Sequence, residues 1–116
     1  MRGEQKMVTK VTARRFKAHP SLIEYAQSSI NKLSKFYDGL IKGEIILSYE
    51  KSIHSVKVVK IILGVYGQEI MAEAKSEDFF KSIDEVVEKI EVQLKKYKAK
   101  LHDKNRKKVR TIREKA

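Results

Sequence analysis

The chain has 116 residues, 41% of them hydrophobic, with one proline and five glycines, a composition that suits one folded domain and excludes a disordered or fibrous chain. It has no cysteine, which excludes disulfides, thiol catalysis and thiolate metal sites. The formal net charge is +11 and no apolar run is long enough to span a membrane, so we expect a cytoplasmic protein with an anionic partner.

A strand and a helix are predicted in the first third of the chain. Residues 7–13 alternate between two faces, as in a strand. Residues 20–37 carry an apolar residue every three or four positions, and Pro20 suits the first turn of a helix. Asp38 and Gly39 are expected to end this helix. Its inward-facing positions are Leu22, Ala26, Ile30, Leu33 and Tyr37.

Three further strands are predicted in the middle of the chain, at residues 44–51, 57–66 and 69–75, with a turn at 52–55. Their connections have only a few residues, which is enough for hairpins and too short for a parallel crossover. These three strands are therefore expected to be antiparallel.

A long amphipathic helix is predicted at residues 78–104. Its apolar stripe consists of Phe80, Ile83, Val87, Ile90, Leu94, Tyr97 and Leu101. The complete order is β-α-β-β-β-α, which predicts an α+β domain with one four-stranded, mainly antiparallel sheet and both helices packed on one face. We expect a domain at residues 1–104 and a basic tail at 105–116.

Lysines form a row on the other side of this last helix. Lys89, Lys96, Lys100 and Lys107 lie at gaps of seven, four and seven, which keeps them within roughly 20° of one line. Residues 95–116 hold 11 lysines and arginines against two acids, so most of the net positive charge lies in the last fifth of the chain. A solvated helix face is the alternative interpretation, but this concentration favours binding to the backbone of a structured RNA.

Residues for catalysis or metal binding are not grouped in the sequence. His19, His54 and His102 lack the spacing of metal ligands, and Glu85 and Glu88 are interpreted as solvated. No phosphate-binding loop is present in its usual strand-loop-helix context. We therefore predict a non-enzymatic protein without a metal, a cofactor or a small-molecule substrate.

Several segments resemble one known family. These are INKLSKFYD at 30–38, LSYEK at 47–51, Gly67 with IMA at 70–72, and EDFFKSID at 77–84 followed by KIEVQLKKYK at 89–98. In this order and spacing they resemble the ribosome hibernation-promoting factor family, also called ribosome-associated inhibitor A or sigma-54 modulation protein. The resemblance implies a fold similar to a double-stranded-RNA-binding domain with an added strand.

The resemblance also implies a function. Members of this family bind the small ribosomal subunit and its rRNA in the channel of the mRNA and the A- and P-site tRNAs, and they inactivate or store ribosomes under stress. The RNA-binding residues expected here, from the lysine row and from this resemblance together, are Lys32, Lys35, Lys89, Lys96, Lys98, Lys100, Lys104 and Lys107. Lys32 and Lys35 would widen the basic surface if the two helices lie side by side.

Two positions depart from the family pattern. Val92 stands where the family often has arginine, and His19 replaces a usual helix-capping threonine, so that we expect a looser start of the first helix. The length and the basic tail are typical of a short member, which we expect to be a monomer when free. The alternatives are a general double-stranded-RNA-binding module without ribosome preference, and an assembly protein that uses a coiled-coil seam on the last helix.

Overall fold

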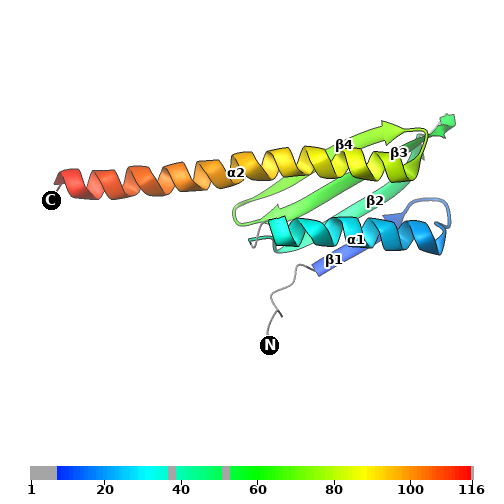
Figure 1. The fold of residues 1–116 in the computed structure, drawn as a ribbon, viewed down its shortest axis with the longest axis horizontal. Helices are drawn as coiled ribbons and strands as arrows, with labels where there is room; N and C mark the ends of the chain where they lie inside the picture. Colours follow the sequence, from blue (N-terminus) through cyan, green and yellow to red (C-terminus); the bar gives the residue numbers. More distant parts are fainter. Residues whose placement is uncertain (1–7, 37–38, 51–52, 116) are drawn as a thin grey trace.

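The computed structural model describes residues 8–36, 39–50 and 53–115, and their side chains apart from those of residues 36, 53, 54 and 101–115. The elements are β1 (Val8–Ala13), α1 (Pro20–Phe36), β2 (Lys42–Glu50), β3 (Ile53–Val65), β4 (Gln68–Ser76) and α2 (Phe79–Lys115). Figure 1 shows both helices in front of one sheet. The predicted order and the α+β class are confirmed. None of the described helices is long and apolar enough to cross a membrane.

The sheet has the strand order β1-β2-β3-β4. The two later pairs are antiparallel hairpins, as predicted, whereas β1 pairs with β2 in parallel. This difference follows from the connections, because α1 carries the chain back between β1 and β2. The helices run in the same direction across the sheet, so that the last turns of α1 lie beside the middle of α2, and α2 continues past the end of α1 (Figure 1).

One hydrophobic core lies between the helices and the sheet. It consists of alternate strand residues and one stripe from each helix, as period-two and period-3.6 patterns require. The buried side chains come from the sheet (Ile45, Leu47, Val59, Ile61, Leu63, Val65, Ile70 and Ala74), from Leu40 just before β2, from α1 (Leu22, Ala26, Ile30 and Leu33) and from α2 (Phe79, Ile83, Val86, Ile90, Leu94 and Tyr97).

The rotational phase of the first turns of α2 differs from the prediction. Phe79 is buried, with 6% of its surface exposed, whereas Phe80, which was predicted to face inward, is 40% exposed and packs edge-on against Tyr25. Val86 is fully buried and Val87 only partly. Either member of each adjacent pair keeps a gap of three or four to the next buried isoleucine, so periodicity could not choose between them.

Two predicted element boundaries also differ. Residues 53–55 belong to β3 and not to a turn, because Ile53 already pairs with Glu50. α2 continues beyond residue 104 to Lys115, so the predicted boundary between domain and tail falls inside a helix. Tyr37 and Leu101, which were assigned to the apolar stripes of the helices, lie outside the residues whose side chains are described, and so does Met7, the first residue of the predicted strand.

Both helices begin with a side-chain cap. The Nδ1 atom of His19 accepts a hydrogen bond of 3.1 Å from the backbone N–H of Ser21, and Oδ1 of Asp78 accepts one of 2.9 Å from the N–H of Phe80. Each acceptor satisfies an N–H group that has no partner within its helix. His19 thus takes the capping role expected of a threonine, while the looser start of the first helix stays a prediction.

Candidate nucleic-acid interface

α2 has two flanks on either side of its buried stripe, and they face different neighbours. On the α1 flank, the Tyr25 hydroxyl donates a hydrogen bond to Oδ1 of Asp84, beside the contact between the rings of Tyr25 and Phe80. This hydrogen bond, together with burial and the negative charge of Asp84, raises the pKa of Tyr25 above its usual value. α1 is therefore held against α2 by a polar contact and an aromatic one.

The β4 flank of α2 lies over the outer edge of the sheet. Lys89 Nζ donates a hydrogen bond of 2.8 Å to the carbonyl of Glu73, and Gln93 Nε2 donates one of 2.7 Å to the carbonyl of Met71. An edge strand leaves such carbonyls without a partner strand. Lys89, the first member of the predicted lysine row, is thus exposed but also holds the edge of β4.

Lys96 and Lys100 continue this flank toward the β3–β4 turn. Lys96 lies seven residues, or about two helical turns, beyond Lys89, and Lys100 lies seven residues beyond Gln93. Both lysines are exposed. Here α2 is joined to the β3–β4 turn by Tyr97, whose hydroxyl donates a hydrogen bond of 2.8 Å to the carbonyl of Tyr66. These two lysines therefore lie at the same end of the domain as the turn.

The first-helix pair lies on the opposite flank. Lys32 follows Tyr25 by seven residues and so lies on the side of α1 that faces α2, and Lys35 is exposed one turn later. Lys98 follows Asp84 by fourteen residues and lies on the α1 flank of α2. The helices are side by side, as predicted. Lys32, Lys35 and Lys98 lie on the α1 side of α2, however, whereas Lys96 and Lys100 lie on its β4 flank.

Five of the eight expected RNA-binding residues thus form two groups around one end of the helical layer. Lys32, Lys35 and Lys98 flank the seam between the helices, and Lys96 and Lys100 lie on the β4 flank. Lys95, which is exposed on the solvent side between the flanks, was not among the expected contacts, although the same helical period identifies it. The side chains of Lys104 and Lys107 lie outside the described residues.

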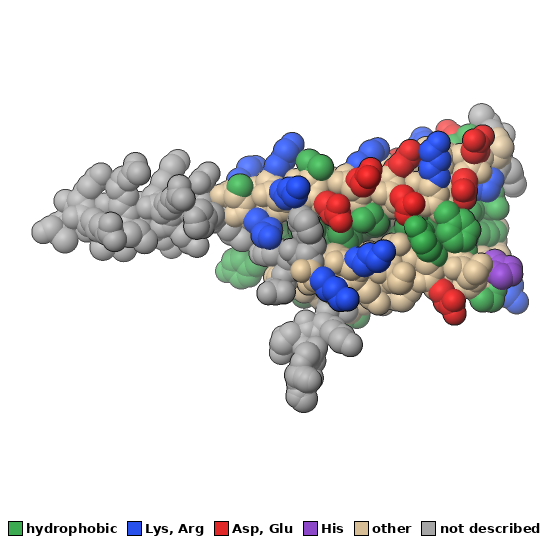
Figure 2. Space-filling model, viewed as in Figure 1, with side chains coloured by type: hydrophobic (Ala, Val, Ile, Leu, Met, Phe, Trp, Pro, Cys, Tyr) green, Lys and Arg blue, Asp and Glu red, His purple; other side chains and the backbone are tan. Residues whose placement is uncertain are grey.

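Charge is graded along the helical layer. Figure 2 shows acidic side chains over the first half of α2 and basic side chains toward the C-terminal ends of the described helical surface. The exposed or half-exposed acids of this first half are Asp84, Glu85, Glu88 and Glu91. Phosphates are therefore attracted to one end of this layer and repelled from the other.

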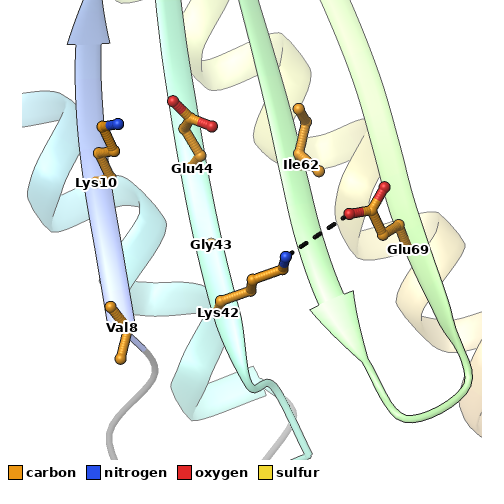
Figure 3. Close-up of a pocket in the computed structure, with 7 residues that line it drawn as sticks. All are labelled: Val8, Lys10, Lys42, Gly43, Glu44, Ile62 and Glu69. Atoms are coloured by element: carbon orange, nitrogen blue, oxygen red, sulfur yellow. Dashed lines mark ion pairs between the residues drawn. The ribbon is translucent and has the colours of Figure 1, made fainter.

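The uncovered face of the sheet has mixed charge. A hollow of about 300 Å³ lies there, between Lys10, Lys42, Glu44 and Glu69. Lys42 reaches across β3 to Glu69 on β4, at 3.9 Å (Figure 3). The stem of Lys42 occupies the space above Gly64, where a Cβ atom would lie 2.8 Å from its Cγ. Paired charges of both signs make this face a weaker attractor of RNA than the basic end.

Metal-binding geometry is not found in the described part of the chain, where no three histidines or carboxylates gather around one point. His19 is used as a helix cap, and His54 and His102 lie outside the described side chains. What the described geometry offers is a basic surface of defined shape.

Known proteins are similar to this chain in sequence and in fold. A model of the family described as sigma 54 modulation protein / S30EA ribosomal protein matches residues 9–102. The ribosome hibernation promoting factor of Klebsiella oxytoca is 30% identical over 95 residues, which cover 82% of this chain and 97% of that protein. The protein of the same name from Escherichia coli K12 is equally similar, with 30% identity over 95 residues.

Two solved structures are also similar to this fold. A ribosomal subunit interface protein from Coxiella burnetii has a TM-score of 0.72 and 29% identity, over 80% of this chain and 99% of that one. The N-terminal domain of Thermus thermophilus Protein Y has a TM-score of 0.66 and 20% identity, over 78% and 98% of the two chains. The latter likeness concerns the fold alone.

Proposed function

Because the chain belongs to the sigma 54 modulation protein / S30EA ribosomal protein family, we propose that it is a ribosome-binding translation inhibitor that serves as a hibernation factor. It binds the small ribosomal subunit through rRNA, in the channel of the mRNA and the A- and P-site tRNAs, and inactivates or stores ribosomes in the cytoplasm under stress. The family match across most of the chain carries this proposal. No catalytic step is part of it.

The graded charge of the helical layer supports this mode of binding. Lys35, Lys96 and Lys100 are exposed around one end of the layer, where they reach phosphates without any change in the core. Each phosphate that a lysine neutralises releases counterions, so that affinity falls steeply with salt. Recognition then depends on the shape and backbone of folded rRNA more than on base sequence.

The acidic first half of α2 gives this binding a direction. Glu88 and Glu91 are repelled by the same phosphates that attract Lys96 and Lys100. The domain therefore approaches RNA with the C-terminal ends of its described helical surface, while the carboxylates point away from the phosphate-rich surface. A helix of uniform positive charge would lack this preference.

Sedimentation with purified small ribosomal subunits at a series of salt concentrations tests the proposal. The test variant carries Lys35→Gln, Lys96→Gln and Lys100→Gln. The matched control carries Lys10→Gln, Lys42→Gln and Lys75→Gln, which remove the same charge from exposed positions on the uncovered face of the sheet. The slope of log affinity against log salt is negative. If each of the three helical lysines contacts a phosphate, this slope becomes shallower by about 2 to 3 in the test variant.

The control is expected to keep the wild-type slope apart from a small general effect of net charge. Equal losses in the two variants would contradict the helical layer as the interface. Failure of the wild-type protein to sediment with subunits at low salt would contradict ribosome binding itself. Duplex RNA that competes as well as small subunits would favour a general double-stranded-RNA-binding module.

A further inference from the structure

An exposed aromatic ring stands at the end of the sheet, in the turn between β3 and β4. Tyr66 has 83% of its surface exposed. A large aromatic side chain gains stability from burial, and most tyrosines bury at least part of the ring. At Tyr66 the fold leaves the ring available to a partner.

The backbone that carries this ring is fixed. Val65 pairs with Gln68, so that Tyr66 and Gly67 alone form the loop, and Gly67 has a φ of 84°, which favours glycine. The Tyr97 hydroxyl also donates to the Tyr66 carbonyl, at 2.8 Å. A fixed backbone lowers the conformational entropy that is lost when the ring binds.

Cations lie beside the turn. The hydrogen bonds from Lys89 to Glu73 and from Gln93 to Met71 show that α2 moves along β4 by two strand residues for every four helix residues. The rise is about 6 Å for both, so continuing this register brings Lys96 and Lys100 to the level of the β3–β4 turn. An exposed ring beside a pair of lysines is the combination that binds single-stranded nucleic acid.

We propose that Tyr66 stacks on an unpaired base of the bound rRNA while Lys96 and Lys100 contact the adjacent phosphates. This inference rests on the proposed function and adds a second mode of contact to it. The lysines supply attraction that depends on salt, whereas stacking does not depend on counterion release. The two contributions can therefore be measured separately.

Binding of the full chain to small ribosomal subunits, measured at several salt concentrations, tests this. Tyr66→Ala is expected to weaken binding about 5- to 100-fold with an unchanged salt slope, and Tyr66→Phe, which keeps the ring, to stay within about twofold of wild type. Lys96→Gln is expected to make the slope of log affinity against log salt shallower by about 0.7 to 0.9. Because Tyr66 is exposed, melting temperatures should be equal, which separates binding from folding.

Fluorescence provides the second measurement. The chain has no tryptophan, so Tyr66→Trp places a single indole in the turn. Stacking on a base is expected to quench its emission when subunits are added. Wild-type affinity of Tyr66→Ala would overturn the inference while leaving ribosome binding intact. Weakened binding of Tyr66→Ala without quenching in Tyr66→Trp would also overturn it, because the ring would then contact ribosomal protein.

Discussion

Alanine substitution of two neighbouring phenylalanines tests the rotational phase of α2. The ring of Phe79 lies in the core, with its centroid 5.3 Å from that of Phe16 and 5.4 Å from that of Tyr49. Phe80 is 40% exposed, and its ring centroid lies 5.1 Å from that of Tyr25. The two substitutions remove the same atoms from adjacent positions, so that each is the control for the other.

The expected costs differ severalfold. Phe79→Ala leaves a cavity between rings, and substitutions of this kind lower the free energy of unfolding by about 3 to 5 kcal/mol. Phe80→Ala loses one edge contact and part of an exposed surface, for about 1 kcal/mol. At roughly 3 to 5 °C per kcal/mol for a domain of this size, the melting temperature falls by about 10 to 20 °C in the first case and by about 3 to 5 °C in the second.

Urea titration followed by circular dichroism measures both free energies, and equal m-values would show that the unfolded states are comparable. A loss at Phe80 equal to or larger than that at Phe79 would refute the phase of the helix. It would also refute the assignment of Lys96 and Lys100 to the β4 flank, since all these positions are linked by one helical period.

Three further predictions concern single hydrogen bonds. Because the bond to Asp84 raises the pKa of Tyr25, the folded state favours the neutral phenol. The free energy of unfolding should therefore fall as the pH rises above the usual tyrosine pKa of about 10. In urea titrations across this pH range, Tyr25→Phe should lack the part of this fall that Tyr25 causes. His19→Ala should lower stability by about 1 kcal/mol and His19→Asp should restore most of it, while a melting curve of His19→Ala identical to wild type would exclude the cap. Lys89→Met keeps the apolar stem but loses the hydrogen bond to a β4 carbonyl, so it should lower the free energy of unfolding by about 0.5 to 1 kcal/mol in urea titrations. The control Lys96→Met should change this free energy by about zero. Equal losses in the two variants would show that the edge contact contributes nothing.

Much of the fold was predictable because strands and helices have distinct periods. Alternation found all four strands, and the short connections identified the antiparallel hairpins. The errors occurred where local pattern was ambiguous. The polar residues at 52–55 indicated a turn, but pairing of Ile53 with Glu50 extends β3 through part of that segment. Adjacent apolar residues at the start of α2 left its rotation open by one position.

The candidate interface was predictable in composition and only partly in arrangement. Helical spacing placed Lys89, Lys96 and Lys100 on one line, and the resemblance added Lys32 and Lys35. Spacing within one helix does not reveal which element lies beside each flank. Only the packing of α1 and β4 against α2 shows that Lys32 and Lys35 lie on one side of α2, and Lys96 and Lys100 on the other. The same packing gave Lys89 a second role at the sheet edge, which no sequence pattern indicates.

The parallel pairing of β1 makes this strand the least anchored part of the sheet. It has a single neighbouring strand, its first residue Val8 is 74% exposed, and its side chains are at best partly buried. The hairpins from β2 to β4 join residues close in sequence, whereas β1 reaches β2 only after the whole of α1 has been laid down. β1 should therefore dock last during folding, and its amide protons should exchange with solvent well before those of β3.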